Sequence, residues 1–130
     1  MNLNDFMREL CKKLSSFKFH AELIKELLPI MRESGNESSF INQLVYCLSI
    51  LDDLGVLATN HKNFEPLGNG VYSMRMKNGN YNIRILYMFF PDKSPVLLHA
   101  FYERAGHQRT DYTGKIKIAR KRFTELKEER

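Results

Sequence analysis

The apolar residues of the first half of the chain recur with a helical period. They stand at every fourth position from Phe6 to Leu14, and the run HAELIKELLPIMRE repeats them at about 3.6-residue spacing. A third apolar stripe follows the break SGNE and ends at Gly55. The pattern predicts three helices within residues 1–55, the second of them kinked or shortened at Pro29.

The second half changes to the period of two that is typical of strands. The runs VYSMRMK and YNIRILYMFF flank the Asn-Gly dipeptide at 78–79, which suits a two-residue type I′ hairpin turn. With that turn, Lys77 pairs with Asn80, and Arg75 and Arg84 become diagonal neighbours. We therefore predict a β-hairpin in which every second side chain faces a core.

The rest of the chain completes an α+β fold. The run VLLHAFYE predicts a third long strand, and a short strand precedes Leu67. A last helix follows with Ile116, Ala119, Phe123 and Leu126 directed inward and Lys115, Lys121 and Arg122 directed outward. We expect one domain, 1–130, with helices in 1–55, an antiparallel meander of three to four strands in 64–104 and a basic C-terminal helix in 112–128.

The second face of the predicted hairpin is strongly cationic. Arg75, Lys77 and Arg84 share it with Asn80 and Asn82, whereas the first face is apolar. Like charges that close destabilise a hairpin by a few tenths of a kcal/mol, about 0.2–1 at most. A cationic cluster with such a cost suggests a functional role.

The net charge of +5 lies entirely at the C-terminal end. Residues 1–103 carry eleven Lys/Arg and eleven Asp/Glu, and residues 104–130 carry nine against four. A basic tail beside a basic hairpin face favours a polyanionic partner, because phosphate neutralisation dominates nucleic-acid affinity. For the tail alone, a solvated terminal helix is the simpler interpretation.

Several classes of protein are disfavoured by composition. No apolar run approaches the roughly 20 residues of a membrane span, and the first residues lack the pattern of a signal peptide. Cys11 and Cys47 are isolated, as reduced thiols in a cytoplasmic protein would be. The four histidines lie on separate elements, and no Gly-rich loop joins a strand to a helix. We expect no metal, no cofactor and no membrane partner.

The remaining polar residues suit metal-free chemistry on RNA. They are Arg75, Lys77, Arg84, Arg104, His107, Arg109 and Tyr112. Cleavage of RNA through its own 2′-hydroxyl needs a proton acceptor, a proton donor and cations that stabilise the phosphorane. Arginine suits the last role because its planar fork binds phosphate with two hydrogen bonds.

Each candidate also has a structural alternative. Arg75 and Arg84 could simply form ion pairs with Glu103 or another surface carboxylate. His107 and Arg109 could be solvent-facing loop residues, and Tyr112 could anchor the start of the last helix. His99, within an apolar strand, is more typical of a semi-buried histidine than of a base.

Four motifs resemble the RelE/HigB family of toxins, specifically its phage-derived branch. They are GVYSMR at 70–75, IRILY at 83–87, LLHAF at 97–101 and ARKR at 119–122. The resemblance implies a small αβ endoribonuclease that cuts mRNA on the ribosome, inhibits translation and is silenced by a helix-turn-helix antitoxin. It places the catalytic role on Arg75, Lys77, Arg84, Arg104 and Tyr112. From the residues themselves, we add His107 as a catalytic candidate and Arg109, Lys115, Arg120 and Lys121 as candidates for RNA binding.

The chain departs from the family pattern in three places. ERAGHQR at 103–109 stands where the branch usually has KKTQKTP, which loses a Lys and the Pro. The strand that normally precedes the helical hairpin is missing, because the chain begins at a helix, and the helical region is longer. A non-enzymatic module of the same fold, binding RNA or a protein partner, is therefore the alternative function.

Overall fold

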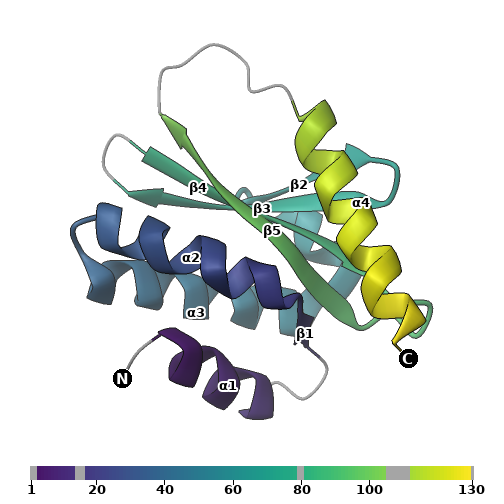
Figure 1. Cartoon of the computed structure of the whole chain (residues 1–130), viewed down its shortest axis with the longest axis horizontal. Helices are drawn as coiled ribbons and strands as arrows, with labels where there is room; N and C mark the ends of the chain where they lie inside the picture. Colours follow the sequence, from purple (N-terminus) through teal and green to yellow (C-terminus); the bar gives the residue numbers. More distant parts are fainter. Residues whose placement is uncertain (1–2, 14–16, 79–80, 105–111, 130) are drawn as a thin grey trace.

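The computed structural model describes residues 3–13, 17–78, 81–104 and 112–129, and these form an α+β fold, as expected (Figure 1). In chain order the elements are α1 (Leu3–Lys13), β1 (Lys18–Phe19), α2 (Ala21–Glu33), α3 (Glu37–Leu54), the 3-10 helix η1 (Gly55–Asn60), β2 (Phe64–Gly68), β3 (Val71–Asn78), β4 (Tyr81–Phe89), β5 (Pro95–Arg104) and α4 (Thr113–Glu128).

Local chemistry explains where the long helices begin and end. The Asn36 side chain accepts a hydrogen bond from the Ser39 N–H and caps α3, and Gly55 terminates this helix with a positive φ of 55°. In α2, His20 caps the first turn by accepting from the Glu22 N–H. The expected shortening at Pro29 is wrong, because α2 continues through this residue to Glu33.

The helical segment Glu37–Asn60 is long and apolar enough to cross a membrane when judged by length and composition alone. This differs from the sequence-based expectation that no segment approaches a span. In the fold the same segment packs its apolar stripe against the sheet, through Phe40, Leu44, Cys47, Leu48 and Leu51. Core helices pass the same test of composition, so it is weak evidence for a membrane span.

The sheet has five strands in the order β1-β5-β4-β3-β2, which corrects the expected three to four. The additional strand is β1, which pairs in parallel with β5 through Lys18–Val96 and Phe19–Leu97. The strand thought to be missing before the helical hairpin is therefore present, and α1 precedes it. Two residues are too few to give a periodic pattern, so the sequence does not predict this strand.

The β3–β4 register also differs from the expected one. Asn78 pairs with Tyr81 and Lys77 with Asn82, so the two strands are offset by two residues from the predicted pairing. A shift of two residues preserves which side chains share a face. It does place Arg75 directly opposite Arg84 rather than on the diagonal.

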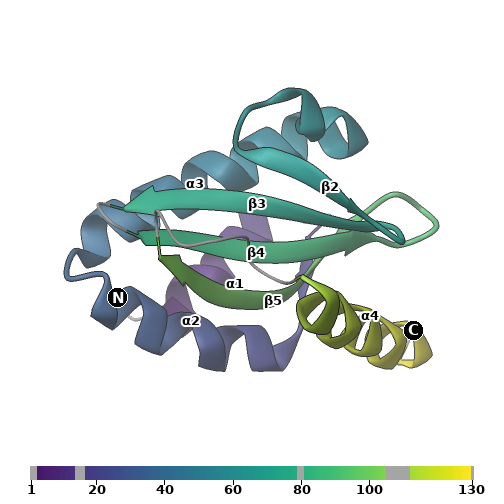
Figure 2. The ribbon, with the colours of Figure 1, turned by 90° about the horizontal axis from the view of Figure 1, so that it is seen from above.

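Two hydrophobic cores lie on opposite faces of the sheet. Figure 1 shows α2 and α3 on one side of the strands and α4 on the other. The larger core joins α2 and α3 to Met74, Met76, Ile83 and Ile85, and the smaller joins α4 to Val71, Leu86, Met88, Val96 and Leu98. Figure 2 shows α4 against one end of β3, β4 and β5, while at the other end the described helices α2 and α3 lie only on the opposite face of the sheet.

Glu26 of α2 connects three elements at the outer edge of β5. Its carboxylate accepts hydrogen bonds from the Ala100 N–H at 3.1 Å and from Arg122 of α4 at 2.8 Å, and it lies 2.8 Å from Nδ1 of His99. Arg122 also donates to the Leu98 carbonyl at 2.9 Å. The expectation that Arg122 points outward is therefore wrong. Its guanidinium instead donates a hydrogen bond to a backbone carbonyl on the edge of β5, beyond the two residues that the short β1 pairs with.

The pKa of Glu26 records the strength of this network. Burial alone would raise the pKa, but the hydrogen bonds with His99, Arg122 and the Ala100 N–H outweigh it and lower the pKa from 4.5 to about 2. Because the pKa in the folded state lies below the ordinary value, the ionised carboxylate contributes stability above about pH 4.5. This contribution is lost as the pH falls from 4.5 through 2.

We expect Glu26→Gln to lower the free energy of unfolding by about 1–3 kcal/mol at pH 7, because the amide leaves buried donors without a charged acceptor. Urea denaturation at pH 7 and pH 3 measures this, and the difference from the wild type should shrink at pH 3. Glu22→Gln is the matched control: Glu22 lies on the same helix in an exposed pair with Lys25 and should change stability by about 0.5 kcal/mol or less. Equal effects of the two variants at pH 7 would contradict the role assigned to Glu26.

Candidate nucleic-acid interface

The end of the sheet that α4 leaves uncovered is polar. Along β3 and β4, the face that carries Val71 and Leu86 under α4 continues to charged and amide side chains at the other end. The residues of this polar face are Ser73, Arg75 and Lys77 of β3, Asn82 and Arg84 of β4 and Glu103 of β5. One face of the same strands thus forms core at one end and a candidate site at the other.

Arg84 lies at the centre of the polar face and is held by two carboxylates. Its Nη1 donates to Oε1 of Glu65 at 2.8 Å, and its Nε and Nη2 donate to Oε1 of Glu103 at 3.3 Å. Nη1 also lies 3.4 Å from the Ser73 hydroxyl. The side chain is only 11% exposed. The structural alternative for Arg84, an ion pair with Glu103, is thus confirmed, and Glu65 is a second partner.

Glu103 is the acceptor on which the cluster converges. Besides Arg84, its Oε1 accepts from the Asn82 amide at 3.3 Å, and its Oε2 accepts from the Tyr112 hydroxyl at 2.9 Å. The Glu103 side chain is 13% exposed. Sequence reasoning named Glu103 only as a possible ion-pair partner and missed Glu65 altogether. Asn82 and Glu103 pair directly across β4 and β5, and the register of these two strands was not predicted from the sequence.

Tyr112 precedes the first turn of α4 and contacts the same cluster. Burial, followed by the hydrogen bond to Glu103, raises the pKa of Tyr112 to about 12, although the nearby Arg84 charge opposes the shift. The carbon of the Arg84 guanidinium lies 5.9 Å from the centre of the Tyr112 ring. Tyr112 is therefore protonated near neutral pH, where it donates a hydrogen bond and does not act as a base.

Arg75 and Lys77 are the cations that the polar face leaves available. Arg75 is half-buried and directly opposite Arg84, and Lys77 is exposed. Among the described residues, no carboxylate lies within ion-pair distance of either side chain. Their charges can therefore meet an external anion without first breaking an ion pair.

The other predicted residues are only partly brought to this face. Lys115 of α4 lies beside it, with its ammonium 4.7 Å from the centre of the Phe101 ring. Lys121 is exposed on α4. Arg104 ends β5, but its side chain, like all of His107 and Arg109, lies outside the part of the chain that the structure describes.

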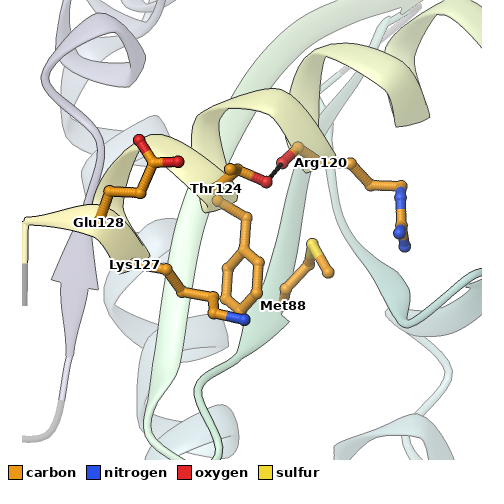
Figure 3. Close-up of a pocket in the computed structure, with 6 residues that line it drawn as sticks. Met88, Arg120, Thr124, Lys127 and Glu128 are labelled. Atoms are coloured by element: carbon orange, nitrogen blue, oxygen red, sulfur yellow. Dashed lines mark hydrogen bonds between the residues drawn. The ribbon is translucent and has the colours of Figure 1, made fainter.

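Arg120 belongs to a different surface. It donates a hydrogen bond to the Asn69 carbonyl and borders a pocket of about 380 Å³. Figure 3 shows this pocket between α4 and β4, lined by Met88, Phe123, Thr124, Lys127 and Glu128 as well as Arg120. Met88 is four residues beyond Arg84 along β4, about 13 Å at 3.3 Å per residue. The prediction that Arg120 joins the RNA-binding cluster has no support from this geometry.

Other residues with reactive or metal-binding side chains lie away from the polar face. His99 is buried beside Glu26, deeper than the semi-buried position expected from the sequence, and no described residue forms a hydrogen bond with its Nε2. Within the described residues, no group of three His, Cys, Asp or Glu side chains is placed to hold a metal ion. Cys47 is a buried free thiol whose pKa burial raises to about 11, so it is unreactive near neutral pH.

Comparison with known proteins gives one informative result. The family model described as phage-derived protein Gp49-like (DUF891) matches residues 41–124, which include α3 from its second turn, all of β2 to β5 and most of α4. A search of curated proteins gives no match. The matched region contains the complete polar face.

A double-mutant cycle tests the ion pair at the centre of this face. We expect Arg84→Ala and Glu103→Ala each to lower stability by about 1–3 kcal/mol, since each leaves its partner's charge partly buried and uncompensated. The double variant should cost less than the sum, by about 0.5–3 kcal/mol. Thermal or urea unfolding measures all four proteins. Arg75→Ala, directly opposite Arg84 but without a described carboxylate partner, is the control and should change stability by about 0.5 kcal/mol or less. Strict additivity would mean that the pair contributes nothing.

Proposed function

Because the chain belongs to the phage-derived Gp49-like family, known as RelE-like toxins, we propose that it is the toxin of a toxin–antitoxin system and cleaves mRNA without a metal ion. The observation that carries the catalytic part is the Glu103–Arg84 pair beside two cations, Arg75 and Lys77, that have no carboxylate partner among the described residues. The proposed partners are translating ribosomes with their mRNA and a helix-turn-helix antitoxin. The proposed location is the cytoplasm.

RNA binding is assigned to Arg75 and Lys77 first. Both lie on β3 with side chains on the polar face. A single strand of RNA presents one phosphate per nucleotide, and Lys or Arg side chains that neutralise phosphates supply most of the affinity. Lys115, at the edge of the same face, extends this cationic surface toward α4.

Glu103 is the best candidate for the base in the proposed cleavage. Its Oε2 already accepts an O–H donor, the Tyr112 hydroxyl, at 2.9 Å. A ribose 2′-hydroxyl that replaces this donor would pass its proton to the carboxylate as the O2′–P bond forms and the P–O5′ bond breaks. The leaving oxygen needs a proton in return, for which Lys77 and His107 are the candidates in the sequence.

Arg84 has two roles in this scheme. It orients Glu103 through two N–H donors, and its charge lies where negative charge grows on the phosphorane. Glu65 and Glu103 already balance its charge in the free protein, so Arg84 should add little to ground-state binding. An interaction that strengthens only in the transition state is what raises the rate of the chemical step.

The same ion pairs favour one alternative. If Glu65 and Glu103 do not release Arg84 when RNA binds, the polar face is a binding surface without catalytic groups. The chain would then be a non-enzymatic module of the fold that binds RNA or a protein through Arg75 and Lys77. Measuring cleavage and binding separately distinguishes the two functions.

Cleavage is tested with purified protein and translating ribosomes, by mapping the 5′ ends of the mRNA. We expect new ends that require the ribosome, and growth arrest when the protein is produced in a bacterium without an antitoxin. Glu103→Gln keeps the size and one acceptor oxygen, so it should lower the cleavage rate by about 10²–10⁴-fold while RNA affinity changes little. Its melting curve shows whether it is folded. Full activity in this variant would remove Glu103 from the chemistry, and no cleavage by the folded wild type would favour the binding module.

Salt dependence tests the binding role of Arg75 and Lys77. The affinity for a single-stranded RNA should fall linearly on a log–log plot against salt, with a slope of about −0.7 per neutralised phosphate. Arg75→Gln combined with Lys77→Gln should reduce the magnitude of the slope by about 1.4. Lys25→Gln on α2, on the other side of the sheet, is the control and should leave the slope unchanged. A slope that the double variant does not change would show that these cations do not contact phosphate.

A further inference from the structure

The exposed hydrophobic side chains of the structure gather in one segment. Five large hydrophobic residues are exposed among those described, and four of them lie on α3 and η1: Tyr46, Leu54, Val56 and Leu57. Leu57 is the most exposed of all, at 63%. The fifth, Ile118, stands alone on α4. Scattered single hydrophobic residues are ordinary on a surface, whereas a gathered set often marks an interaction site.

The charge of this segment is opposite to that of the whole chain. Residues 33–61 contain Glu33, Glu37, Asp52 and Asp53 but no Lys or Arg, so they carry −4 in a protein of net charge +5. All four acidic side chains are exposed. Asp52 and Asp53 lie at the η1 end of α3, and Glu33 and Glu37 lie at its other end. The exposed Arg32 and Lys62 border this stretch of 29 residues without a cation.

Tyr46 lies between the end of η1 and a groove along the start of α3. Its hydroxyl lies 3.2 Å from Nε2 of His61, the residue that follows η1, and the two rings meet edge to face at 5.8 Å. On its other side, Tyr46 borders a shallow groove of about 480 Å³ along the first turns of α3. The other residues of the groove are all uncharged: Asn36, Ser38, Ser39, Asn42 and Gln43. A tyrosine between an apolar segment and a groove lined by amides and hydroxyls is typical of protein interfaces.

This surface lies on the other side of the sheet from the candidate RNA face. The buried side of α3 packs into the larger core, together with Met74 and Ile85, whose strand neighbours Arg75 and Arg84 point the opposite way. Figure 1 shows α3 and α4 on opposite sides of the strands. A partner bound to α3 and η1 would therefore leave the polar face accessible.

We propose that the α3–η1 surface, defined by Tyr46, Leu54, Val56 and Leu57, binds an amphipathic helix of a protein partner whose apolar stripe is flanked by Lys and Arg. The exposed Asp52 and Asp53, which directly precede Leu54, complement such flanks, and they disfavour nucleic acids and anionic lipids. The exposed Leu57 and its neighbours supply the apolar contact that a helix stripe would bury. The inference goes beyond the proposed nuclease and holds whether or not the chain cleaves RNA.

The test uses the full chain and a designed probe, an 18-residue amphipathic peptide of Leu and Lys with a 3.6-residue apolar period. We expect saturable binding by calorimetry or fluorescence anisotropy, weakened at least tenfold in Leu57→Ser, because loss of one buried Leu contact costs about that factor. Ile118→Ser is the matched control on α4 and should leave the affinity unchanged. Leu57 is largely exposed, so its substitution should not unfold the protein, and circular dichroism verifies this.

Other occupants of the surface would give different results. A Leu/Glu peptide of the same period that binds as tightly, and loses affinity in Leu57→Ser, would overturn the charge argument. The protein could also self-associate in sedimentation experiments. If both Leu57→Ser and Ile118→Ser abolished this self-association, the occupant would be a second copy docked through its basic α4, and the proposal would be overturned. Leu57-dependent binding to phosphatidylcholine vesicles without binding of the Leu/Lys peptide would identify a membrane surface instead. Equal peptide binding by wild type and Leu57→Ser would also overturn it.

Discussion

The hydrogen bonds that the Glu103 carboxylate accepts are the interactions on which both the packing of this part of the fold and the candidate site depend. The carboxylate links β5 to β4 through Arg84 and Asn82, and to the start of α4 through Tyr112. Arg75 and Arg84 stand directly opposite each other, an arrangement that like charges destabilise. The carboxylates of Glu103 and Glu65 offset this repulsion, so they allow a sheet to keep two arginines side by side. The same carboxylate supplies the acceptor that RNA cleavage would need, so substituting Glu103 affects stability and chemistry together.

The long elements of the fold were predictable because each has a strong local pattern. The helical period of α2 and α3 and the alternation of β3 to β5 come from burial of one stripe or one face, which sequence spacing reports directly. A local pattern does not show which residues far apart in the sequence contact each other. The contacts of Glu26 reach Ala100 and Arg122, 74 and 96 residues away in the chain, and no local rule relates them. The two-residue β1 exists because β5 offers it a partner, so it too follows from tertiary structure.

The candidate site was predictable by face but not by partner. Alternation alone assigns Arg75, Lys77 and Arg84 to one face, and a register error of two residues does not alter that assignment. The register decides which residues meet: the predicted one placed Lys77 opposite Asn80, whereas Lys77 pairs with Asn82 and Arg75 pairs with Arg84. Either the Asn-Gly or the Gly-Asn dipeptide at 78–80 suits a two-residue turn, so the sequence did not choose between the two registers. The Glu65 contact requires β2 to pair with β3, which a pattern in β2 alone cannot specify.

The distribution of charge divides the molecule into two surfaces for which we propose different partners. Arg75 and Lys77 are cations without described carboxylate partners, whereas Arg84 is already neutralised by two carboxylates. An approaching phosphate gains attraction from the first two and must compete with Glu65 and Glu103 for the third. Competition of this kind weakens ground-state binding through Arg84 but leaves its extra attraction for the more highly charged phosphorane, which favours catalysis over tight binding. On the other side of the sheet, the acidic and apolar α3–η1 surface repels the polyanion that the polar face attracts. The two proposed partners, RNA and a protein helix with basic flanks, would therefore not compete for one surface.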